Sequence, residues 1–456
     1  MHESMLQENY SSEQTKNIFL QAFSSLKLSS TLRQSGIRKS KGIPVIEVFK
    51  FLVLLVFQGK NLYRFLDSVR ANAGYSKNTI YRLLNGSTYN WRRFLHTLAA
   101  RVIGFIVPLT RPKRVNVLIL DDTIIPRNRS KNVELLAKVH DHTSNRFKKG
   151  FTMLTLGWSD GYSFLPTDFA MLSSDNKSNR YQEINDSIDK RTNGYKRRVE
   201  SMQKKTYVAI ELIKNTLNQG IEASYVLMDS WFVHEPLLRA CLDEGIDVIG
   251  MVKQMKQKYF FEGNKYDLKT LRRKLPKCRK SNIIGDIVVT TKNNIPVKLV
   301  YVKNRNKKQS WLVILSTDCS LSNEEIVRIY GNRWSIEVFF KSTKSLLKLG
   351  NEFQGRSYDM MISHTTIVMT RFIMTEWLRR KENDQKTFGE LFFRFSDEIQ
   401  DMDLNVALLN LTSFVLDLVN GVKSVSAKII KNQLQQWIDQ QAAFIKGLFS
   451  KFCWES

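Results

Sequence analysis

The stretch VNVLILDDT, residues 115–123, is a short β-branched and apolar run that ends in carboxylates. Such a run favours a strand of a sheet. The stretch ASYVLMDSWF, residues 223–232, has the same form, because its apolar run leads into Asp229. Strand ends at the rim of an α/β sheet are where ligand-binding and catalytic groups collect. The two stretches therefore predict an α/β core with acids at its rim.

The segments between and after these strands predict strands and helices in an order typical of a mixed sheet. They are, in order, two strands over residues 150–172 joined by a Ser-Asp-Gly turn at 159–161, a loop over 173–195, a helix over 195–220 closed by Gly220, a helix over 234–244 and a strand over 246–252. Residues 254–318 break this order. They are strongly basic and predict an antiparallel insertion, with three strands over 283–317 and a turn at Asn293-Asn294.

The composition indicates a large globular protein with an anionic partner. The chain has 456 residues, of which 43% are hydrophobic, so it can bury a sizeable core. Lysine and arginine number 70 against 43 acids, which gives a net charge of +27. An excess of this size predicts nucleic acid as the first choice of partner and an anionic membrane surface as the second.

Membrane, disulfide and zinc-binding classes are disfavoured. The longest purely apolar run is FLVLLVF, residues 51–57, far short of the ~20 residues that a membrane span requires. The N-terminal stretch is polar and has no signal-peptide core. The four cysteines are scattered without a CxxC pair, which fits a reducing cytoplasm. His140 and His142 have no neighbouring cysteine pair and are interpreted as ordinary polar residues.

Residues 51–110 predict a basic helical region. This region contains eight lysines and arginines and one acid. Within it, the sequence predicts two helices joined by a turn at Gly74, with Ser76 as the N-cap of the second helix. Lys77 and Arg82 would point outward from that helix as candidate DNA contacts. The pattern fits both a helix-turn-helix and a helical bundle with a solvated basic face.

The stretch YGNRWSIEVFFKSTKSLL, residues 330–347, contains a single acid, Glu337, among basic and aromatic residues. At about 100° per residue, helix offsets of 0, 3, 7 and 14 lie within roughly 60° of one another. The residues at these offsets are Tyr330, Arg333, Glu337 and Lys344. A core-facing stripe would be apolar, so this one faces solvent or a site. The simpler alternative is a surface ion pair between Arg333 and Glu337.

Asp122 and Asp229 are partners with which Glu337 could form a metal site. A buried aspartate at a strand end needs a partner, and a divalent cation is a natural one. Two aspartates on neighbouring strands and a glutamate on a following helix can hold two Mg²⁺ ions about 4 Å apart. This arrangement suits phosphodiester chemistry, and the basic residues beside Glu337 could hold the phosphates of the strand being cut.

At this point the residues resemble a known family. The Y-x2-R-x3-E-x6-K spacing of Tyr330, Arg333, Glu337 and Lys344 is similar to the Y-R-E-K signature of the insertion-sequence-four family of transposases. These are cut-and-paste enzymes with an RNase H-like core and a D-D-E triad. LILDDT resembles the first-aspartate strand of that family, and VLMDSWF resembles the second. A β-rich insertion between the second aspartate and the glutamate, here residues 254–318, is also a family feature. The resemblance covers about residues 115–380.

The resemblance assigns Asp122, Asp229 and Glu337 as the metal-binding triad, with two Mg²⁺ ions as cofactors and Mn²⁺ as a substitute. The choice between Asp121 and Asp122 is open, because adjacent strand residues face opposite sides of the sheet. The family pattern places the catalytic aspartate directly before threonine, which selects Asp122. The opposite choice would follow if Asp121→Asn abolished cleavage and Asp122→Asn left it intact.

The resemblance also implies DNA contacts around the triad. Tyr330, Arg333 and Lys344 would contact the transposon end near its terminal phosphate. Trp311 stands at the start of the last insertion strand, where the family has an aromatic that stacks on a flipped base. The alternative for Trp311 is a ring packed within the sheet. Lys253, just past the strand over 246–252, is a further candidate contact.

The predicted fold is an RNase H-like mixed-sheet α/β core with a β-rich insertion, flanked by helical regions. The predicted segments are a helical DNA-binding region over residues 1–112, the first part of the core over 113–253, the insertion over 254–318, the second part of the core with the helix of the third acid over 319–385, and a C-terminal helical region suited to dimerisation over 386–456.

The resemblance implies a DNA transposase that binds terminal inverted repeats and target DNA, works as a dimer in the synaptic complex, and is cytoplasmic at the bacterial nucleoid, with no membrane partner. Cleavage would free a 3′-hydroxyl that attacks the opposite strand, giving a hairpin, or attacks target DNA. One alternative is a related RNase H-like nuclease without strand transfer. Another is a domesticated, non-catalytic DNA-binding protein, which the presence of all three acids disfavours.

Overall fold

The computed structural model describes residues 18–399 and Gln436, apart from residues 67–75, 112, 142–143, 186, 254–256, 276–281, 305–306, 308–309, 353–354 and 383–384. The described residues form two compact units. The first contains residues 18–56 and Lys60–Leu391, and the second contains Phe57–Gly59 and the described residues after Leu391. Most of the predicted C-terminal region, 386–456, therefore lies outside the described residues.

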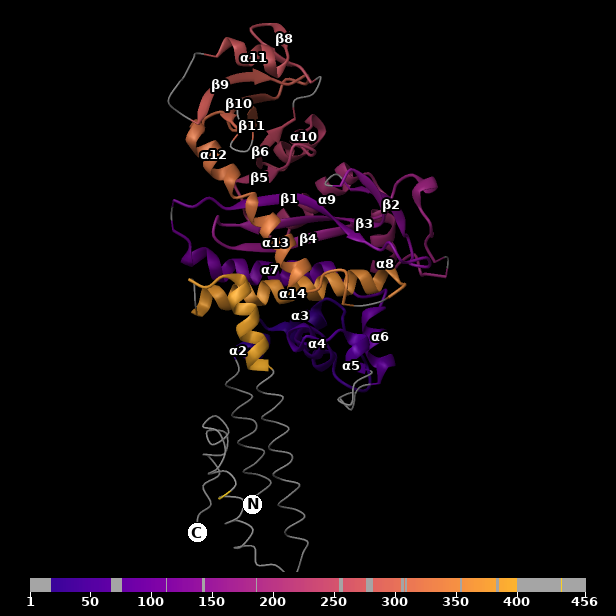
Figure 1. Cartoon of the computed structure of the whole chain (residues 1–456). Coiled ribbons are helices and arrows are strands. Elements are labelled where there is room, and N and C mark those ends of the chain that lie inside the picture. Colours follow the sequence, from indigo (N-terminus) through magenta and orange to yellow (C-terminus); the bar gives the residue numbers. More distant parts are fainter. Residues whose placement is uncertain are drawn as a thin grey trace, which may run out of the picture. The chain divides into compact units, whose positions relative to one another are not determined.

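A mixed sheet is the centre of the first unit, and within the described residues it has eleven strands (Figure 1). These are β1 (Val117–Pro126), β2 (Ala137–Asp141), β3 (Arg146–Ser159), β4 (Phe164–Leu172), β5 (Tyr225–Met228), β6 (Asp247–Val252), β7 (Tyr259–Phe261), β8 (Asn264–Tyr266), β9 (Ile283–Thr290), β10 (Pro296–Lys303) and β11 (Trp311–Ser316). Their order is β2-β3-β1-β5-β6-β11-β10-β9-β7-β8, and β4 also pairs with β3.

The sheet combines parallel and antiparallel pairing. The strands β1, β5 and β6 are parallel neighbours, whereas β3 is antiparallel to both β1 and β4. The apolar run of β1 is buried from Val117 to Leu120, as expected for a strand covered on both faces. This topology confirms the predicted mixed α/β fold and is consistent with an RNase H-like core.

The three strands predicted in the insertion are confirmed as β9, β10 and β11. They are antiparallel, and β11 pairs with β6, so the insertion extends the central sheet instead of forming a separate one. The predicted turn is present between β9 and β10, where Asn294 has a φ of 61°. The helix α11 (Leu268–Lys274) and the hairpin of β7 and β8 were not predicted.

Helices cover the sheet. The α-helices before β1 are α2 (Ile18–Ser25), α3 (Leu28–Gln34), α4 (Val45–Leu54), α5 (Leu62–Leu66), α6 (Lys77–Leu84) and α7 (Trp91–Ile106). Those after β4, besides α11, are α8 (Asn193–Ser201), α9 (Lys205–Leu217), α10 (Glu235–Asp243), α12 (Asn323–Gly331), α13 (Trp334–Ser345) and α14 (Tyr358–Glu382). The described residues also include the short 3-10 helices η1 (Leu55–Gln58), η3 (Val107–Leu109) and η4 (Lys177–Asn179).

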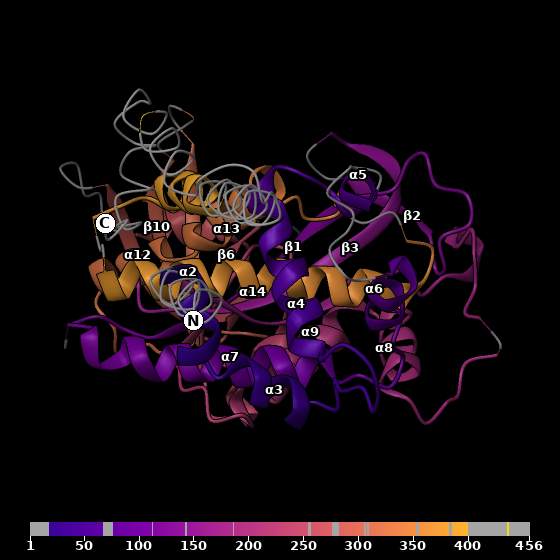
Figure 2. The same cartoon turned by 90° about the horizontal axis from the view of Figure 1, so that it is seen from below.

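The helices α7 and α14 pack against β4 and against each other (Figures 1 and 2). The helices α4 and α6 pack in turn on α14. The helix predicted after the turn at Gly74 is confirmed as α6, with Ser76 as its N-cap and Ile80, Leu83 and Leu84 buried. The predicted turn at Gly74 lies outside the described residues. No helix in the described part of the chain is long and apolar enough to cross a bilayer.

Two sequence predictions need correction. The helix predicted over 195–220 is two helices, because residues 202–204 turn between them and Lys204 is extended. Both helices pack on β4, but α8 also contacts α14, whereas α9 also contacts β3 and α10. The first strand does not end at Asp122. It continues to Pro126, because β3 pairs with it along its whole length.

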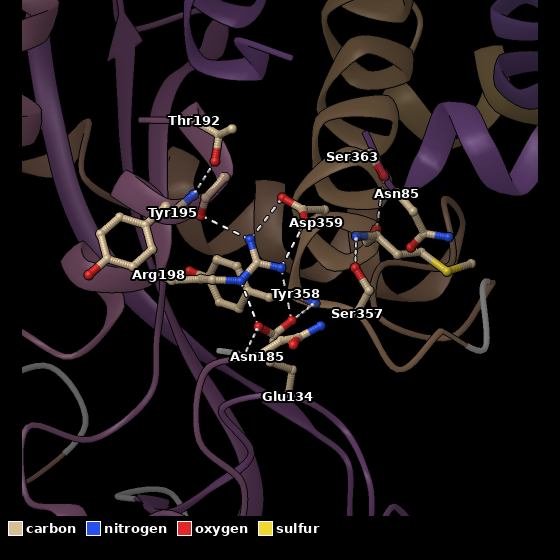
Figure 3. Close-up of polar contacts among 12 residues, drawn as sticks. Asn85, Glu134, Asn185, Thr192, Tyr195, Arg198, Ser357, Tyr358, Asp359 and Ser363 are labelled. Atoms are coloured by element: carbon tan, nitrogen blue, oxygen red, sulfur yellow. Dashed lines mark hydrogen bonds and ion pairs between the residues drawn. The ribbon is translucent and has the colours of Figure 1, made fainter. Parts of the chain in front are cut away.

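A buried arginine joins three distant segments of the first unit. The guanidinium of Arg198, on α8, lies between the carboxylates of Glu134 and Asp359 (Figure 3). It donates to Glu134 at 2.6 and 2.8 Å and to Asp359 at 3.0 and 2.7 Å. The carboxylate of Glu134 also accepts from the backbone N–H groups of Asn185 and Tyr358. The cluster therefore connects the segment before β2, the loop before α8 and the start of α14.

A second buried cluster surrounds Asp168 of β4. Arg92 donates to its carboxylate at 2.8 Å, and the imidazole of His96 lies at 3.2 Å. Burial alone would raise the pKa of Asp168, but the neighbouring side chains of Arg92, His96 and Arg197 hold that pKa well below its usual value. The pairs fix α7, which carries Arg92 and His96, against β4.

Candidate active site at the edge of the sheet

The strands β1 and β5 place two acids side by side. Their register pairs Leu120 with Met228, so the next residues along each strand are Asp121 and Asp229. Matched residues of neighbouring strands project from the same face of a sheet, whereas Asp122 projects from the other face. This register favours Asp121, and not the predicted Asp122, as the neighbour of Asp229.

Arg333 connects Asp121 to the third predicted acid. Its Nη1 donates to Asp121 Oδ2 at 3.1 Å, and its Nη2 donates to Glu337 Oε1. The simple surface pair considered from the sequence is therefore present, but the same guanidinium also contacts an acid of the sheet. This bridge brings Glu337, on α13, to the edge where β5 ends.

The stretch around Arg333 is two helices and not the single helix expected. The helix α12 begins with a capping box of Ser322 and Glu325 and ends at Gly331, and α13 begins at Trp334. The intervening Asn332 and Arg333 keep right-handed helical dihedral angles. The guanidinium of Arg333 consequently remains 5.9 Å from the centre of the Tyr330 ring.

Burial makes the charged groups at this edge interdependent. It raises the pKa of Asp121 to about 7, although Arg333 lowers that pKa, and the charges of Asp122 and Asp229 raise it further. Burial also raises the pKa of Tyr330 to about 12. The carboxylates therefore need a cation nearby, and in this structure Arg333 provides it.

The donor groups at this edge fit a divalent metal. Asp121, Asp229 and Glu337 supply only carboxylate oxygens, the ligands that Mg²⁺ prefers. Within the described residues, no three metal-binding side chains lie close enough together to hold an ion. The guanidinium of Arg333 is instead the cation between Asp121 and Glu337. The acids can gather around a metal only if Arg333 withdraws.

Asp122 has a different partner on the opposite face of β1. Lys205, the first residue of α9, donates to Asp122 Oδ2 at 2.8 Å. The same ammonium lies 3.5 Å from the centre of the Trp231 ring. Neither Lys205 nor Trp231 was singled out from the sequence. Trp231 stands only two residues after Asp229, but the sequence does not reveal that its ring is exposed, and Lys205 is one of many lysines.

The other predicted contact residues have varied surroundings. Lys344, near the end of α13, donates to Thr123 Oγ1 at 2.5 Å, and burial lowers its pKa. Lys253 is exposed and directly follows β6. Trp311 is buried, and its ring lies 5.5 Å from that of Tyr301. In this structure the ring of Trp311 is therefore packed within the insertion, as the alternative interpretation expected.

Lys77 and Arg82 are both exposed on α6. This helix packs on α14 in the helical layer. Their outward direction agrees with the sequence prediction, and contact with DNA stays a prediction.

Comparison with known proteins gives one family. The model of a family described as DDE superfamily endonuclease matches residues 52–280, which is half of the chain. The match includes Asp121, Asp122 and Asp229 and ends before Glu337. Curated proteins give no match.

Proposed function

The chain belongs to the DDE superfamily of endonucleases, and from that premise we propose that it is a DNA transposase. It would bind the terminal inverted repeats of its own element, cleave the DNA at the ends and join the freed 3′ ends to target DNA. The observation that supports this proposal best is that Asp121 and Asp229 directly follow the paired residues Leu120 and Met228, with Arg333 linking Asp121 to Glu337.

We assign Asp121, Asp229 and Glu337 as the metal-binding triad, in place of the triad with Asp122. DDE superfamily nucleases generally use divalent metals, and Mg²⁺ is the ion that we propose here. When bound, the ions would supply a nucleophile at neutral pH and stabilise the charge on the leaving oxygen. The three carboxylates come from β1, from the end of β5 and from α13, so the fold itself positions them.

Arg333 would have two partners in turn. Without DNA its guanidinium neutralises Asp121 and Glu337. A DNA phosphate is a competing partner, because guanidinium groups bind phosphate through paired hydrogen bonds. Binding of a DNA end would then draw Arg333 away from the carboxylates and free them for metal. Tyr330 and Lys344 would help to hold the same end.

Further DNA contacts would lie outside the triad. Lys77 and Arg82 on α6, with Lys253 after β6, are exposed cations that can neutralise phosphates of the inverted repeat. We propose a dimer in the synaptic complex, since two ends must be held together, and association with the bacterial nucleoid. Stacking of Trp311 on a flipped base would require its buried ring to become accessible.

The direct test incubates purified full-length protein with divalent metal and labelled DNA that carries the repeats flanking its coding region. Cleavage at the repeat ends is expected with Mg²⁺ or Mn²⁺. Absence of end cleavage with every divalent ion, for protein shown to be folded, would exclude the proposed activity. Products in which 3′ ends are joined to target DNA distinguish a transposase from a nuclease that only cuts.

A further inference from the structure

The part of β1 beyond its pairing with β5 borders a pocket, and a second pocket adjoins the first. The strand β5 pairs with β1 only over Val117–Leu120, so β1 continues beyond it towards Pro126. A pocket of about 570 Å³ lies along this part of β1, and a second of about 370 Å³ shares Thr152 and Lys205 with it. The pockets therefore adjoin each other, and the larger one is lined by Asp122 and Thr123, which directly follow the candidate acid Asp121 in β1.

The larger pocket carries an excess of positive charge. Four lysines line it, Lys138, Lys148, Lys205 and Lys344, against two aspartates, Asp122 and Asp141. Two of the lysines are paired with these acids, Lys205 with Asp122 at 2.8 Å and Lys148 with Asp141 at 2.6 Å. Lys344 donates to the hydroxyl of Thr123. The lining is therefore suited to an anion.

The smaller pocket presents an aromatic ring. Trp231 lines it and is 41% exposed, although large aromatic rings are usually well buried. The ring is supported from the side by Phe232, which is fully buried and lies 4.9 Å away. Lys205 lies over the ring. The ring is thus held in place by its neighbours while a large part of it remains accessible.

Cations along a path with an exposed aromatic ring are the features that bind single-stranded nucleic acid. The lysines hold phosphates, and a base of any identity can stack on the ring. We propose that the two pockets bind an unpaired segment of the DNA strand that leaves the candidate active site, with one base stacked on Trp231 and the flanking phosphates held by Lys205 and Lys344. This inference rests on the proposed function, because it takes DNA as the substrate.

Asp122 acquires a role in this arrangement. Its carboxylate holds the ammonium of Lys205 in position between the two pockets. Asp122 would therefore be a positioning residue for the unpaired strand, on the face of β1 opposite to the metal-binding acids.

The test compares the binding of full-length protein to two labelled probes by fluorescence anisotropy. One probe is a blunt duplex, and the other is the same duplex with a short tract of unpaired thymidines at one end. Stacking of one base corresponds to a preference of about 5- to 150-fold for the second probe. Trp231→Ala should abolish the preference, whereas Trp231→Phe should retain most of it.

Tyr207→Ala is the matched control. Tyr207 is 54% exposed on α9, two residues from Lys205, and does not line either pocket. Its replacement should leave the preference unchanged. The unpaired tract should also quench tryptophan emission in the wild-type protein, and this quenching should be smaller in Trp231→Phe, an effect that a merely structural ring would not produce.

The outcomes separate the two proposals. A preference that survives in Trp231→Ala, or a wild-type protein with no preference for the unpaired tract, would overturn the inference while leaving end cleavage intact as a function. A wild-type protein that neither binds nor cleaves any DNA probe would overturn the proposed function and the inference together. Circular dichroism of each variant establishes that it is folded.

Discussion

Replacement of Arg333 should strengthen metal binding in the absence of DNA. In the free protein the guanidinium neutralises Asp121 and Glu337, so a metal ion must displace it from both carboxylates. Arg333→Gln removes this competing charge and keeps an uncharged polar side chain. The variant should therefore bind Mn²⁺ more tightly than the wild-type protein.

The size of the effect follows from the burial of each contact. The side chains of Arg333 and Asp121 are 17% and 16% exposed, so their charge-assisted hydrogen bond contributes about 1.5–3 kcal/mol. The side chain of Glu337 is 36% exposed, and a solvent-screened pair contributes about 0–1 kcal/mol. Displacing both contacts costs about 1.5–4 kcal/mol, which corresponds to ~10- to ~800-fold in metal affinity.

The assay is a titration of DNA-free protein with Mn²⁺, followed by electron paramagnetic resonance or calorimetry. Arg328→Gln is the control, because Arg328 is an exposed cation on the neighbouring α12 and its loss changes the net charge equally. It should leave the affinity near that of the wild-type protein. Equal or weaker Mn²⁺ binding by Arg333→Gln would refute the view that Arg333 competes with metal.

Three further predictions concern the triad and the stability of the fold. Asp121→Asn should abolish DNA end cleavage and Asp122→Asn should retain part of it, as measured by product formation from labelled DNA; the reverse result would support the assignment of Asp122. Arg198→Met should lower the free energy of unfolding by about 3–5 kcal/mol, because it leaves two buried carboxylates without a cation, whereas removal of the fully exposed Arg191 should produce no measurable change in denaturant titrations. Because the folded-state pKa of Asp168 is depressed, its ion pairs stabilise the protein above the unfolded pKa of about 3.9. This stabilisation is lost as the pH falls below that value. As the pH is lowered further, the melting temperature should therefore fall more steeply for wild-type protein than for Asp168→Asn.

Much of the fold could be predicted from local pattern. The apolar runs of β1, β5 and β6 are short and are bounded by polar residues or turns, so their periodicity and length are sufficient to predict strands. The N-cap at Ser76 and the turn of β3 and β4 around Gly161, with a φ of 82°, are local backbone effects and were also predictable. The break between α8 and α9 was not predictable in this way, because no glycine or proline marks residues 202–204.

The candidate site shows the limit of local reasoning most clearly. The order and spacing of the acids indicated the type of chemistry. Asp121 and Asp122, however, are adjacent residues of the same type, so the local sequence cannot tell which of them belongs to the site. The register of β1 against β5 separates them, since it sets Asp121 beside Asp229 and turns Asp122 towards Lys205. Register depends on long-range hydrogen bonds between strands more than 100 residues apart, which no local pattern contains.

The sequence by itself determined the mixed α/β class, the basic character and the acids that follow the apolar runs of two strands, because each depends on composition or on short-range periodicity. Only the tertiary structure decided which acids meet, that Arg333 stands between two of them, and that Trp231 is exposed while Trp311 is buried. The reason is physical: burial and ion pairing depend on which surfaces pack together, and the contacts that set them join residues far apart in the chain.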